Sequence, residues 1–367
     1  MSSPVSCRLA IDADAEDGIF TVTAQRSDPY RIHVSEGLTT NALTGHLRFL
    51  AGHLATSQIV MVIGASAAAH HLDVITAAVA CTGLPLHVLP VEAGIRESGT
   101  APGSLNSLTG VLHQHRAAQR VLVLGVGGGA VCNLVKTASG LQGMPYALVP
   151  TSVQAQLDAG IGYDAANNLP SAHHPAGVYI DPALTSTLPD RHIRAGLAAA
   201  VKVALIINPP LFDTLERTAP RPPAGPALTA IIREALGSKL LLLALHPERQ
   251  LLDLGDRIAS PYRAATGYRI PQGEAVAAGI AVAAAAAFLS GKNRLKERDR
   301  ILNLLTAYRL PLTIPDQLRE PVWKHMAAMG RSPGLVLPHR PGHCTLTDDD
   351  FDRTAFDKAL GDLAARP

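Results

Sequence analysis

One stretch of the chain, residues 121–162, combines a strand, a glycine-rich turn, a helix and a second strand. Val121–Gly125 is a short apolar run rich in β-branched residues, as in a buried parallel strand. The glycines at 127–129 allow a tight turn and leave no Cβ between the backbone and a ligand. Ala130–Ser139 has helical composition, so its free N–H groups face this turn, and Tyr146–Val149 forms the next strand. The stretch therefore predicts a phosphate or dinucleotide site at the start of the helix.

Strands and helices alternate over the first half of the chain, which predicts a doubly wound, Rossmann-like parallel sheet. The expected buried strands are 59–63, 85–91, 121–125 and 146–149, and the expected helices are 43–54, 66–81, 102–115 and 130–139. Residues 18–34 alternate in polarity and predict two antiparallel strands at an edge. Ligands of such sheets bind at the carboxyl ends of the strands, which is where the glycine turn lies.

After about residue 182 the pattern becomes mostly helical. The expected helices are 191–207, 227–245, 273–289, 293–308, 315–329 and 350–364, with a short strand or hairpin at 336–344. Proline-rich breaks are expected at Asn208-Pro209-Pro210 and at 220–226. We therefore predict an α/β nucleotide-binding domain over 1–182 and a mainly α-helical domain over 183–367, with the ligand cleft between them.

Composition excludes several classes of function. With 47% apolar residues, 17% charged residues and a net charge of +2, the chain is not built to attract nucleic acid or anionic membranes. Its four cysteines are scattered without a CxxC, so neither a zinc knuckle nor a disulfide framework is expected. The N-terminus resembles no secretory signal, and the longest apolar run, 275–289, is shorter than the roughly 20 residues of a membrane span. We expect a cytoplasmic protein.

Five separated motifs resemble, in order, those of the sugar phosphate cyclase family, which contains 3-dehydroquinate synthase and the valiolone synthases. They are GVGGGAVCNL (125–134), VPTSVQAQLDAGIG (149–162), TLPDRHIRAGLAAAVKVALI (187–206), RQLLDLGD (249–256) and QGEAVAAG (272–279). The LDAGIG and DRHI segments, Asp253 and the Ser260-Pro261 pair resemble the 2-epi-5-epi-valiolone synthase branch.

This resemblance implies a dehydroquinate synthase-like fold and a homodimer. It also implies a phosphate-eliminating carbon–oxygen lyase that oxidises and re-reduces a sugar phosphate with NAD. A divalent metal, usually zinc, then binds substrate hydroxyls and stabilises the developing alkoxide.

The three metal-ligand positions of the family depart from its pattern. The family uses one Glu and two His, and these positions fall on Ala199, Asp256 and Gln272. Alanine has no donor atom, Asp256 offers oxygen, and Gln272 offers only a weak carbonyl. Zinc prefers histidine, cysteine and a carboxylate, so we expect no tight zinc site. Rescue by Glu274 or by a histidine from elsewhere remains an open alternative.

The cofactor side departs as well. Gly64 stands where the family has an acidic residue for the ribose, and Asn133 stands where it has Asp. Gly94-Ile95 replaces a Gly-Glu pair, Gln142 replaces an Arg, and Tyr163-Asp164-Ala165 replaces a lysine-containing segment. We therefore expect NAD binding to be weakened.

The positions that match the family's motifs are our candidate site residues. The cofactor-binding candidates are Gly127, Gly128, Gly129, Asn133, Thr151, Asp158 and Thr187, and the catalytic candidates are Lys202, Asp253 and Lys239. Each also has a structural interpretation: the glycines and Gly273-Glu274 serve the fold, Asp158 caps a helix, and Lys202 lies extended along the surface. The close histidine pairs, 70/71, 113/115 and 173/174, are expected on the solvated surface.

Three functions follow. The first is a degenerate cyclase homologue, a pseudoenzyme that serves as a non-catalytic or regulatory partner in cyclitol or secondary-metabolite biosynthesis. The second is an active cyclase that takes a sugar phosphate and uses NAD with an altered or absent metal, Lys202 and Asp253 handling protons. The third is a small-phosphate binding protein built on the glycine turn.

Overall fold

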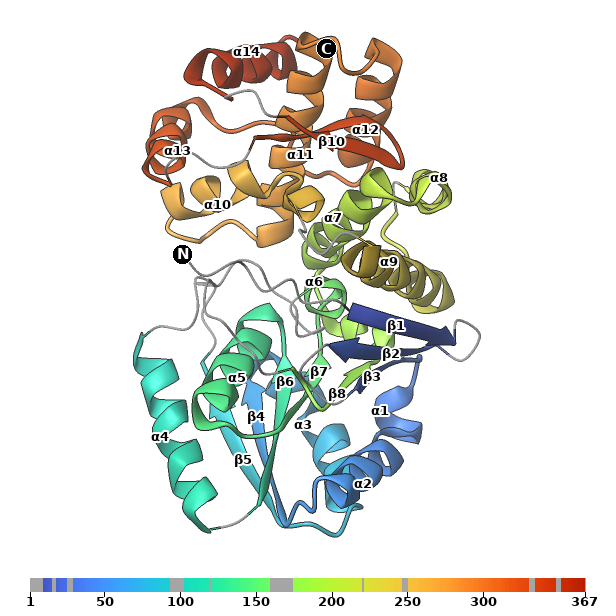
Figure 1. The fold of residues 1–367 in the computed structure, drawn as a ribbon, viewed down its shortest axis with the longest axis vertical. Helices are drawn as coiled ribbons and strands as arrows, with labels where there is room; N and C mark the ends of the chain where they lie inside the picture. Colours follow the sequence, from blue (N-terminus) through green and yellow to red (C-terminus); the bar gives the residue numbers. More distant parts are fainter. Residues whose placement is uncertain are drawn as a thin grey trace. The chain divides into compact units, whose positions relative to one another are not determined.

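The computed structural model describes residues 9–14, 18–24, 29–92, 102–118, 120–158, 174–219, 221–245, 250–329, 334–347 and 351–366. The chain divides into two compact units (Figure 1). Unit 1 comprises residues 1–188 and 224–233, and unit 2 comprises residues 189–223 and 234–367. Helix α9 (Gly225–Leu245) contributes its first part to unit 1 and the remainder to unit 2.

The described part of unit 1 is built on an eight-stranded sheet of order β1-β2-β3-β8-β7-β6-β4-β5. Its strands are β1 (Leu9–Asp14), β2 (Ile19–Ala24), β3 (Tyr30–Val34), β4 (Gln58–Gly64), β5 (Leu86–Val91), β6 (Val121–Gly127), β7 (Tyr146–Pro150) and β8 (Gly177–Ile180). The first three strands pair antiparallel, and all pairs from β3–β8 onward are parallel. This confirms the predicted parallel-dominated sheet with an antiparallel edge, to which β1 adds a strand that the sequence analysis did not anticipate.

Helices cover both faces of this sheet, as a doubly wound fold requires. They are α1 (Leu38–Asn41), α2 (Leu43–His53), α3 (Ala65–Ala80), α4 (Pro102–Ala118), α5 (Gly129–Gln142) and α6 (Val153–Leu157), with the 3-10 turn η2 (Pro182–Thr187). Ile59, Met61 and Ile63 of β4 form one core cluster with apolar residues of α2 and α3. On the opposite face, Gly125 of β6 lies against Val135 of α5. The central strands are buried on both sides, which explains their unbroken apolar sequences.

Unit 2 packs around one apolar helix, α11 (Gln272–Leu289), which contacts four others. Its helices are α7 (Asp190–Ile206), α8 (Pro209–Thr218), the rest of α9, η3 (Gln250–Asp253), α10 (Asp256–Ala265), α11, α12 (Leu295–Ala307), α13 (Asp316–Ala328) and α14 (Arg353–Ala364). Among the described residues, α11 alone is long and apolar enough to span a membrane, but 78% of it is buried inside the protein, as in a core helix. Strands β9 (Val336–Arg340) and β10 (His343–Leu346) form the predicted hairpin.

The expected break at Asn208-Pro209-Pro210 separates α7 from a helix that the sequence did not predict, α8. The Asn208 side chain accepts a hydrogen bond from the Leu211 N–H at 2.9 Å and so caps α8, with Pro209 in its first turn. Proline fits this position because its missing N–H would have no helical acceptor there. The prolines that indicated a break therefore mark the boundary between α7 and α8.

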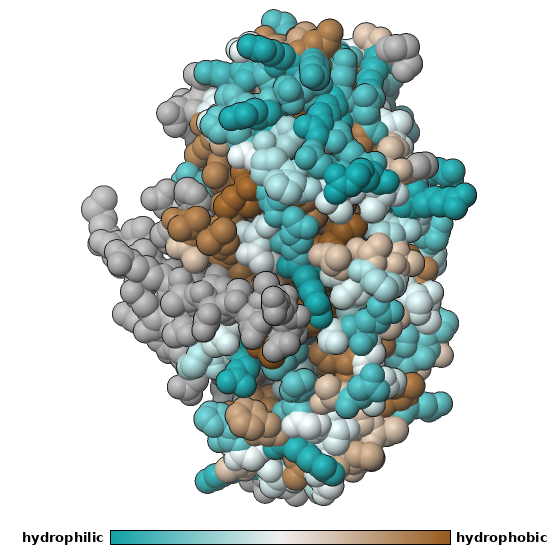
Figure 2. All heavy atoms as spheres, turned by 90° about the vertical axis from the view of Figure 1, so that its right-hand side faces the viewer, coloured by the Kyte–Doolittle hydropathy of each residue, from teal (hydrophilic) through white to brown (hydrophobic). Residues whose placement is uncertain are grey.

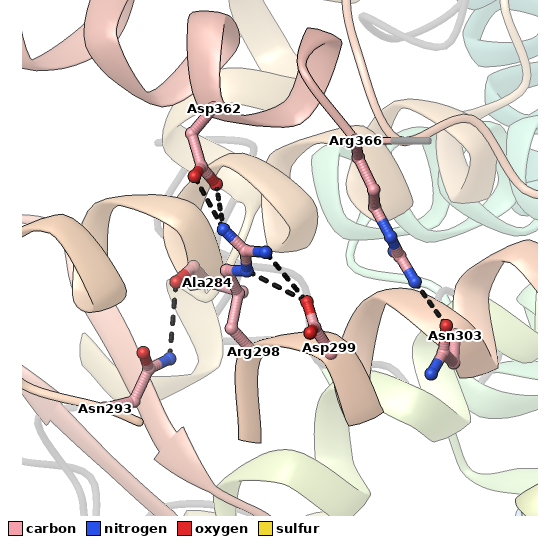
Figure 3. A network of polar contacts seen from close by, with 7 residues as sticks. All are labelled: Ala284, Asn293, Arg298, Asp299, Asn303, Asp362 and Arg366. Carbon is pink, nitrogen blue, oxygen red and sulfur yellow. Dashed lines mark hydrogen bonds and ion pairs between the residues drawn. The ribbon is translucent and has the colours of Figure 1, made fainter. Parts of the chain in front are cut away.

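An arginine network holds the C-terminal helix on unit 2 (Figure 3). Arg298 of α12 donates to both carboxylate oxygens of Asp362 of α14, at 2.6 and 2.7 Å, and also to Asp299. Arg366 donates to the side chain of Asn303, and Asn293 donates to the Ala284 carbonyl. The Arg298 Nη1 group donates to both Asp362 oxygens, and this charge-assisted pair of low exposure ties α12 to α14.

The surface is polar with scattered apolar side chains. Figure 2 shows hydrophilic residues over much of one face, interrupted by smaller hydrophobic patches. Among the most exposed large apolar residues are Phe49 on α2 and Leu241 and Leu245 on α9. Exposed apolar residues at this frequency are ordinary for a folded protein.

Candidate functional site

The glycine turn lies at the carboxyl end of β6, where the sequence predicts it. β6 ends at Gly127, and α5 begins at Gly129 with Gly128 as its N-cap residue. The Val131 and Cys132 N–H groups both bond to the Gly128 carbonyl, so the earlier N–H groups of α5 precede its hydrogen-bonded ladder. A Cβ at Gly127 would lie 2.7 Å from Val131, which explains why this turn needs glycine.

The neighbouring strand brings Thr151 to the same edge. The Thr151 N–H donates to the Gly127 carbonyl at 2.9 Å, which joins the ends of β6 and β7. Ser152 follows and caps α6 by accepting from the Ala155 N–H. Gln156, fully buried, donates to the Pro150 and Asp181 carbonyls and so fixes this loop. The structure thus holds Gly127–Gly129 and Thr151 together.

The other cofactor candidates have separate surroundings. Asn133 lies in the second turn of α5, and among the described residues its side-chain oxygen is buried without a hydrogen-bond partner. Asp158 ends α6 and accepts from the Gln154 amide at 3.2 Å. The hydrogen bonds of Thr187 link it to the Leu184 carbonyl and to His71 of α3. Residues 94–95 and 163–165 lie outside the described residues.

Two of the catalytic candidates of unit 2, Lys202 and Asp253, lie near Asp256. Lys202 of α7 donates to Asp256, the first residue of α10, with an Nζ–Oδ2 distance of 2.7 Å. The side chains are 11% and 33% exposed, so the pair is largely shielded from water. Asp253 lies near this pair. Its burial, and then the negative charge of Asp256, raise its pKa, whereas the positive charge of Lys202 acts in the opposite direction. Lys239, the third candidate, is buried on α9.

The three family metal positions offer few donor atoms. Ala199 presents a buried methyl group on α7, one turn before Lys202. Asp256 has its carboxylate in the ion pair with Lys202, and Gln272 begins α11. Within the described residues, no group of three or more His, Cys, Asp or Glu side chains could hold a metal ion.

Glu274, the alternative oxygen ligand, is engaged elsewhere. Its carboxylate accepts two hydrogen bonds from Arg191 of α7, with an Nη2–Oε2 distance of 2.9 Å. Gln272 and Glu274 are two residues apart in the first turn of α11, so their side chains leave the helix about 200° apart. Glu274 therefore faces away from the side that Gln272 presents.

The histidine pairs are less uniformly exposed than expected. His71 is only 9% exposed and shares a hydrogen bond of 3.2 Å with the Thr187 hydroxyl, so the prediction of a solvated surface is wrong for it. Burial lowers its pKa. His70 and His113 are exposed, as expected, and His173 lies outside the described residues.

A further histidine pair, His33 of β3 and His46 of α2, has no signature in the sequence. Their rings lie 4.0 Å apart, and both stack near Tyr179. They are 13 residues apart in sequence and share no motif, so only the packing of α2 on the sheet reveals them.

Comparison with known proteins agrees with this geometry. Residues 93–195 match the family model of the 3-dehydroquinate synthase N-terminal domain, and residues 196–330 match that of its C-terminal domain. The 2-epi-valiolone synthase of Stigmatella aurantiaca is 34% identical, over 98% of this chain and 94% of that protein. The 2-epi-5-epi-valiolone synthase of Streptomyces glaucescens is 29% identical, over 95% of this chain and 94% of its own length.

Solved structures show the same fold. ValA, the 2-epi-5-epi-valiolone synthase of Streptomyces hygroscopicus subsp. jinggangensis, was solved with NAD+ and Zn2+ bound. It superposes with a TM-score of 0.80 at 25% identity, over 94% of this chain and 99% of ValA. A 2-deoxy-scyllo-inosose synthase superposes with a TM-score of 0.77 at 18% identity, over 92% and 97% of the two chains. With these matches and its helix-covered parallel sheet, the chain belongs to the sugar phosphate cyclase family, as a relative of 3-dehydroquinate synthase and the valiolone synthases.

Proposed function

We propose that this chain is a sugar phosphate cyclase homologue without the metal-dependent cyclase reaction. In this proposal it acts as a non-catalytic or regulatory partner in cyclitol or secondary-metabolite biosynthesis. The observation that carries the proposal is the Lys202–Asp256 ion pair, at 2.7 Å, on a position where the family has a metal-binding histidine.

The donor set does not fit a zinc ion. Structural and catalytic zinc sites use at least three nitrogen, sulfur or carboxylate ligands. Here Ala199 supplies none, Gln272 supplies an amide, and the Asp256 carboxylate already neutralises an ammonium group. A dication placed beside Asp256 would have to displace Lys202 or be repelled by it at close range. We therefore derive no catalytic step through a metal in this chain.

The nucleotide side fits a ligand only in part. The glycine turn and the start of α5 retain the backbone geometry that cradles phosphates. Gly64, however, replaces the acidic residue that the family places against the ribose. A Cβ at Gly64 would lie 2.8 Å from Val131 Cγ2, so no larger side chain fits there until Val131 moves. We propose that NAD binds weakly, through its phosphates, and that a homodimer or another protein partner uses the retained scaffold in the cytoplasm.

Phosphate release tests the proposal. The purified chain is incubated with NAD, sedoheptulose 7-phosphate and added zinc or cobalt, and inorganic phosphate is followed over time. The Stigmatella 2-epi-valiolone synthase is assayed in parallel as the positive control, and circular dichroism verifies that both chains are folded. We expect release from the relative and none above the no-enzyme rate from this chain. Release from this chain at a rate comparable to that of the relative would overturn the proposal.

One observation favours the second candidate, an active cyclase with an altered or absent metal. Asp253, with its raised pKa, lies beside Asp256 and Lys202, and such a group exchanges protons closer to neutral pH. If phosphate is released, Lys202→Ala and Asp256→Ala decide between the two candidates. Loss of turnover in both variants supports this second function, whereas unchanged rates assign the activity to a contaminant and restore the first.

A further inference from the structure

A pocket of about 700 Å³ opens in unit 2 on residues that the candidate site does not use. Its polar lining comes from the helices α7, α10, α11 and α12 and from the turn that follows α12. These residues are Arg191, Tyr262, Glu274, Thr306 and Arg309. The Leu310-Pro311-Leu312 run, which follows α12, adds an apolar wall.

This pocket is distinct from the family's metal position. Glu274 lines it, whereas Gln272, two residues earlier, leaves α11 about 200° away. Lys202 and Asp256 are not among its lining residues. A ligand in the pocket would therefore not contact the Lys202–Asp256 pair.

The charges of the pocket do not balance. Arg191 and Glu274 neutralise each other through their two hydrogen bonds. Arg309 is exposed, and among the residues that the structure describes its guanidinium makes no ion pair and no hydrogen bond. The pocket thus carries one uncompensated positive charge, on a group whose planar fork of donors matches carboxylate and phosphate oxygens.

A neutral hydroxyl lies in the same pocket. Tyr262 is 5% exposed, and burial together with the Glu274 charge raises its pKa, so it stays a protonated donor at neutral pH. The Thr306 hydroxyl donates to the Leu302 carbonyl at 2.8 Å, which leaves its lone pairs outward as acceptors. One cationic donor and one neutral donor are therefore available to an oxyanion.

Arg309 has a left-handed backbone conformation, which is uncommon for residues other than glycine. Arg309 has φ = 55° and sits just past the end of α12. The Arg309 and Leu310 N–H groups bond to the Thr306 and Leu305 carbonyls, at 2.8 and 2.9 Å, as in a Schellman motif. Glycine is the residue best suited to this conformation, and Ala55 occupies the equivalent place after α2. Arg309 therefore does not stabilise this turn. Replacing it with glycine should remove the charge without destabilising the fold, so that stability and binding can be measured separately.

We infer that this pocket binds a small organic oxyanion, a carboxylate or phosphate monoester on an apolar carbon skeleton. Arg309 is its charge partner, Tyr262 its neutral donor, and the wall at Leu310-Pro311-Leu312 the contact for its carbon skeleton. The inference does not depend on whether the chain has cyclase activity.

Calorimetric titration of the full chain tests this with four probes: cyclohexanecarboxylate, cyclohexyl phosphate, neutral cyclohexylmethanol and inorganic phosphate. We expect at least one of the two organic anions to bind in a 1:1 ratio. The ratio of their two dissociation constants shows whether the pocket prefers a carboxylate or a phosphate monoester. We expect the neutral alcohol to bind at least tenfold more weakly. Arg309→Gln and Arg309→Gly should each weaken binding of the anion about 10- to 100-fold, which is the range expected for loss of a charge-assisted hydrogen bond.

Stability measurements keep a folding defect apart from a lost ligand. Arg309→Gly removes the charge, and glycine suits the left-handed backbone, so the thermal midpoint of this variant should not fall. Ala55→Gly is the control at the equivalent turn: its thermal midpoint should not fall either, and it should bind the anion as the parent chain does. Arg294→Gln removes an exposed arginine outside the pocket and should also bind normally. The inference is overturned if no organic anion binds up to about 10 mM, or if both Arg309 variants bind as the parent does.

Discussion

Asp256 forms an ion pair with Lys202 at a position that the motifs assign to a metal ligand of the family. A histidine there would offer a nitrogen to a metal, whereas Asp256 offers a carboxylate that Lys202 satisfies at 2.7 Å. Ala199, one turn before Lys202, contributes no second ligand. The replacement of the family's three ligands by Ala199, Asp256 and Gln272 remains a prediction from the motifs. The ion pair could not be predicted from the sequence, because Lys202 and Asp256 are 54 residues apart and meet only when α7 and α10 pack.

Protonation of His33 should make unit 1 sensitive to acid. Burial, the neighbouring His46 and Arg31 lower the pKa of His33 from 6.5 to about 4, while Tyr179 stacks on its ring. The folded state therefore binds fewer protons than the unfolded state between these values, so stability falls as the pH drops from about 6.5 to about 4. We expect His33→Phe to reduce this loss, as measured by urea unfolding at pH 7.5 and pH 5.

This account would be contradicted if His33→Phe lost as much unfolding free energy between pH 7.5 and pH 5 as the wild type does. His46 also has a pKa lowered by burial and by Arg31, so some acid sensitivity should remain in His33→Phe. His33→Phe/His46→Phe should then show a flatter dependence than either single variant. If the wild type is equally stable at both pH values, His33 does not titrate as its surroundings indicate.

At the scale of elements, periodicity predicted most of the structure. The strand, turn, helix and strand of 121–149 are present as β6, α5 and β7 within a few residues. The prediction placed the break before α8 correctly but missed the helix itself, because its prolines lie at the helix start. It also passed over α10, where Pro261 lies inside the helix and the apolar residues are few. Such elements are set by packing in unit 2, which no local pattern reports.

Close helix contacts in unit 2 explain two glycines of the QGEAVAAG motif, Gly273 and Gly279. A Cβ at Gly273 would lie 1.7 Å from the Ala195 carbonyl oxygen, and one at Gly279 would lie 2.1 Å from the Gly255 carbonyl oxygen. Both contacts involve backbone, which cannot rotate away. Helix α11 can therefore approach α7 and the start of α10 only at glycine.

Gly279→Ala should destabilise the chain despite alanine's higher helix propensity. The added methyl group must push α11 away from Gly255, and overpacking of this kind costs about 1–3 kcal/mol or more. Gly361→Ala in α14 is the matched control, since its Cβ would meet nothing within 4 Å. It should stabilise by about 0.5–1 kcal/mol. Urea unfolding of both variants measures these changes, and equal effects would show that the α11 contact is not tight.

At the scale of the whole molecule, the comparisons establish the scaffold and leave the site as a proposal. Both units keep the fold of the sugar phosphate cyclases, with an intact core in each. The glycine turn is present at the carboxyl end of β6, whereas the replacement of the metal donors and of the acidic ribose contact remains a prediction. Domain limits at residue 182, the cleft between the domains and the homodimer remain predictions. Our proposal is that the fold is kept for binding rather than for the cyclase reaction.

Zinc titration of the wild-type chain tests this account most directly, with Ala199→Glu/Asp256→His/Gln272→His as its matched variant. This variant restores one Glu and two His at the family's positions. We predict that the wild type takes up no stoichiometric zinc, and that the restored variant binds about one ion per chain. One zinc ion per wild-type chain, with a Kd below about 1 μM and lost in Asp256→Ala, would contradict the account.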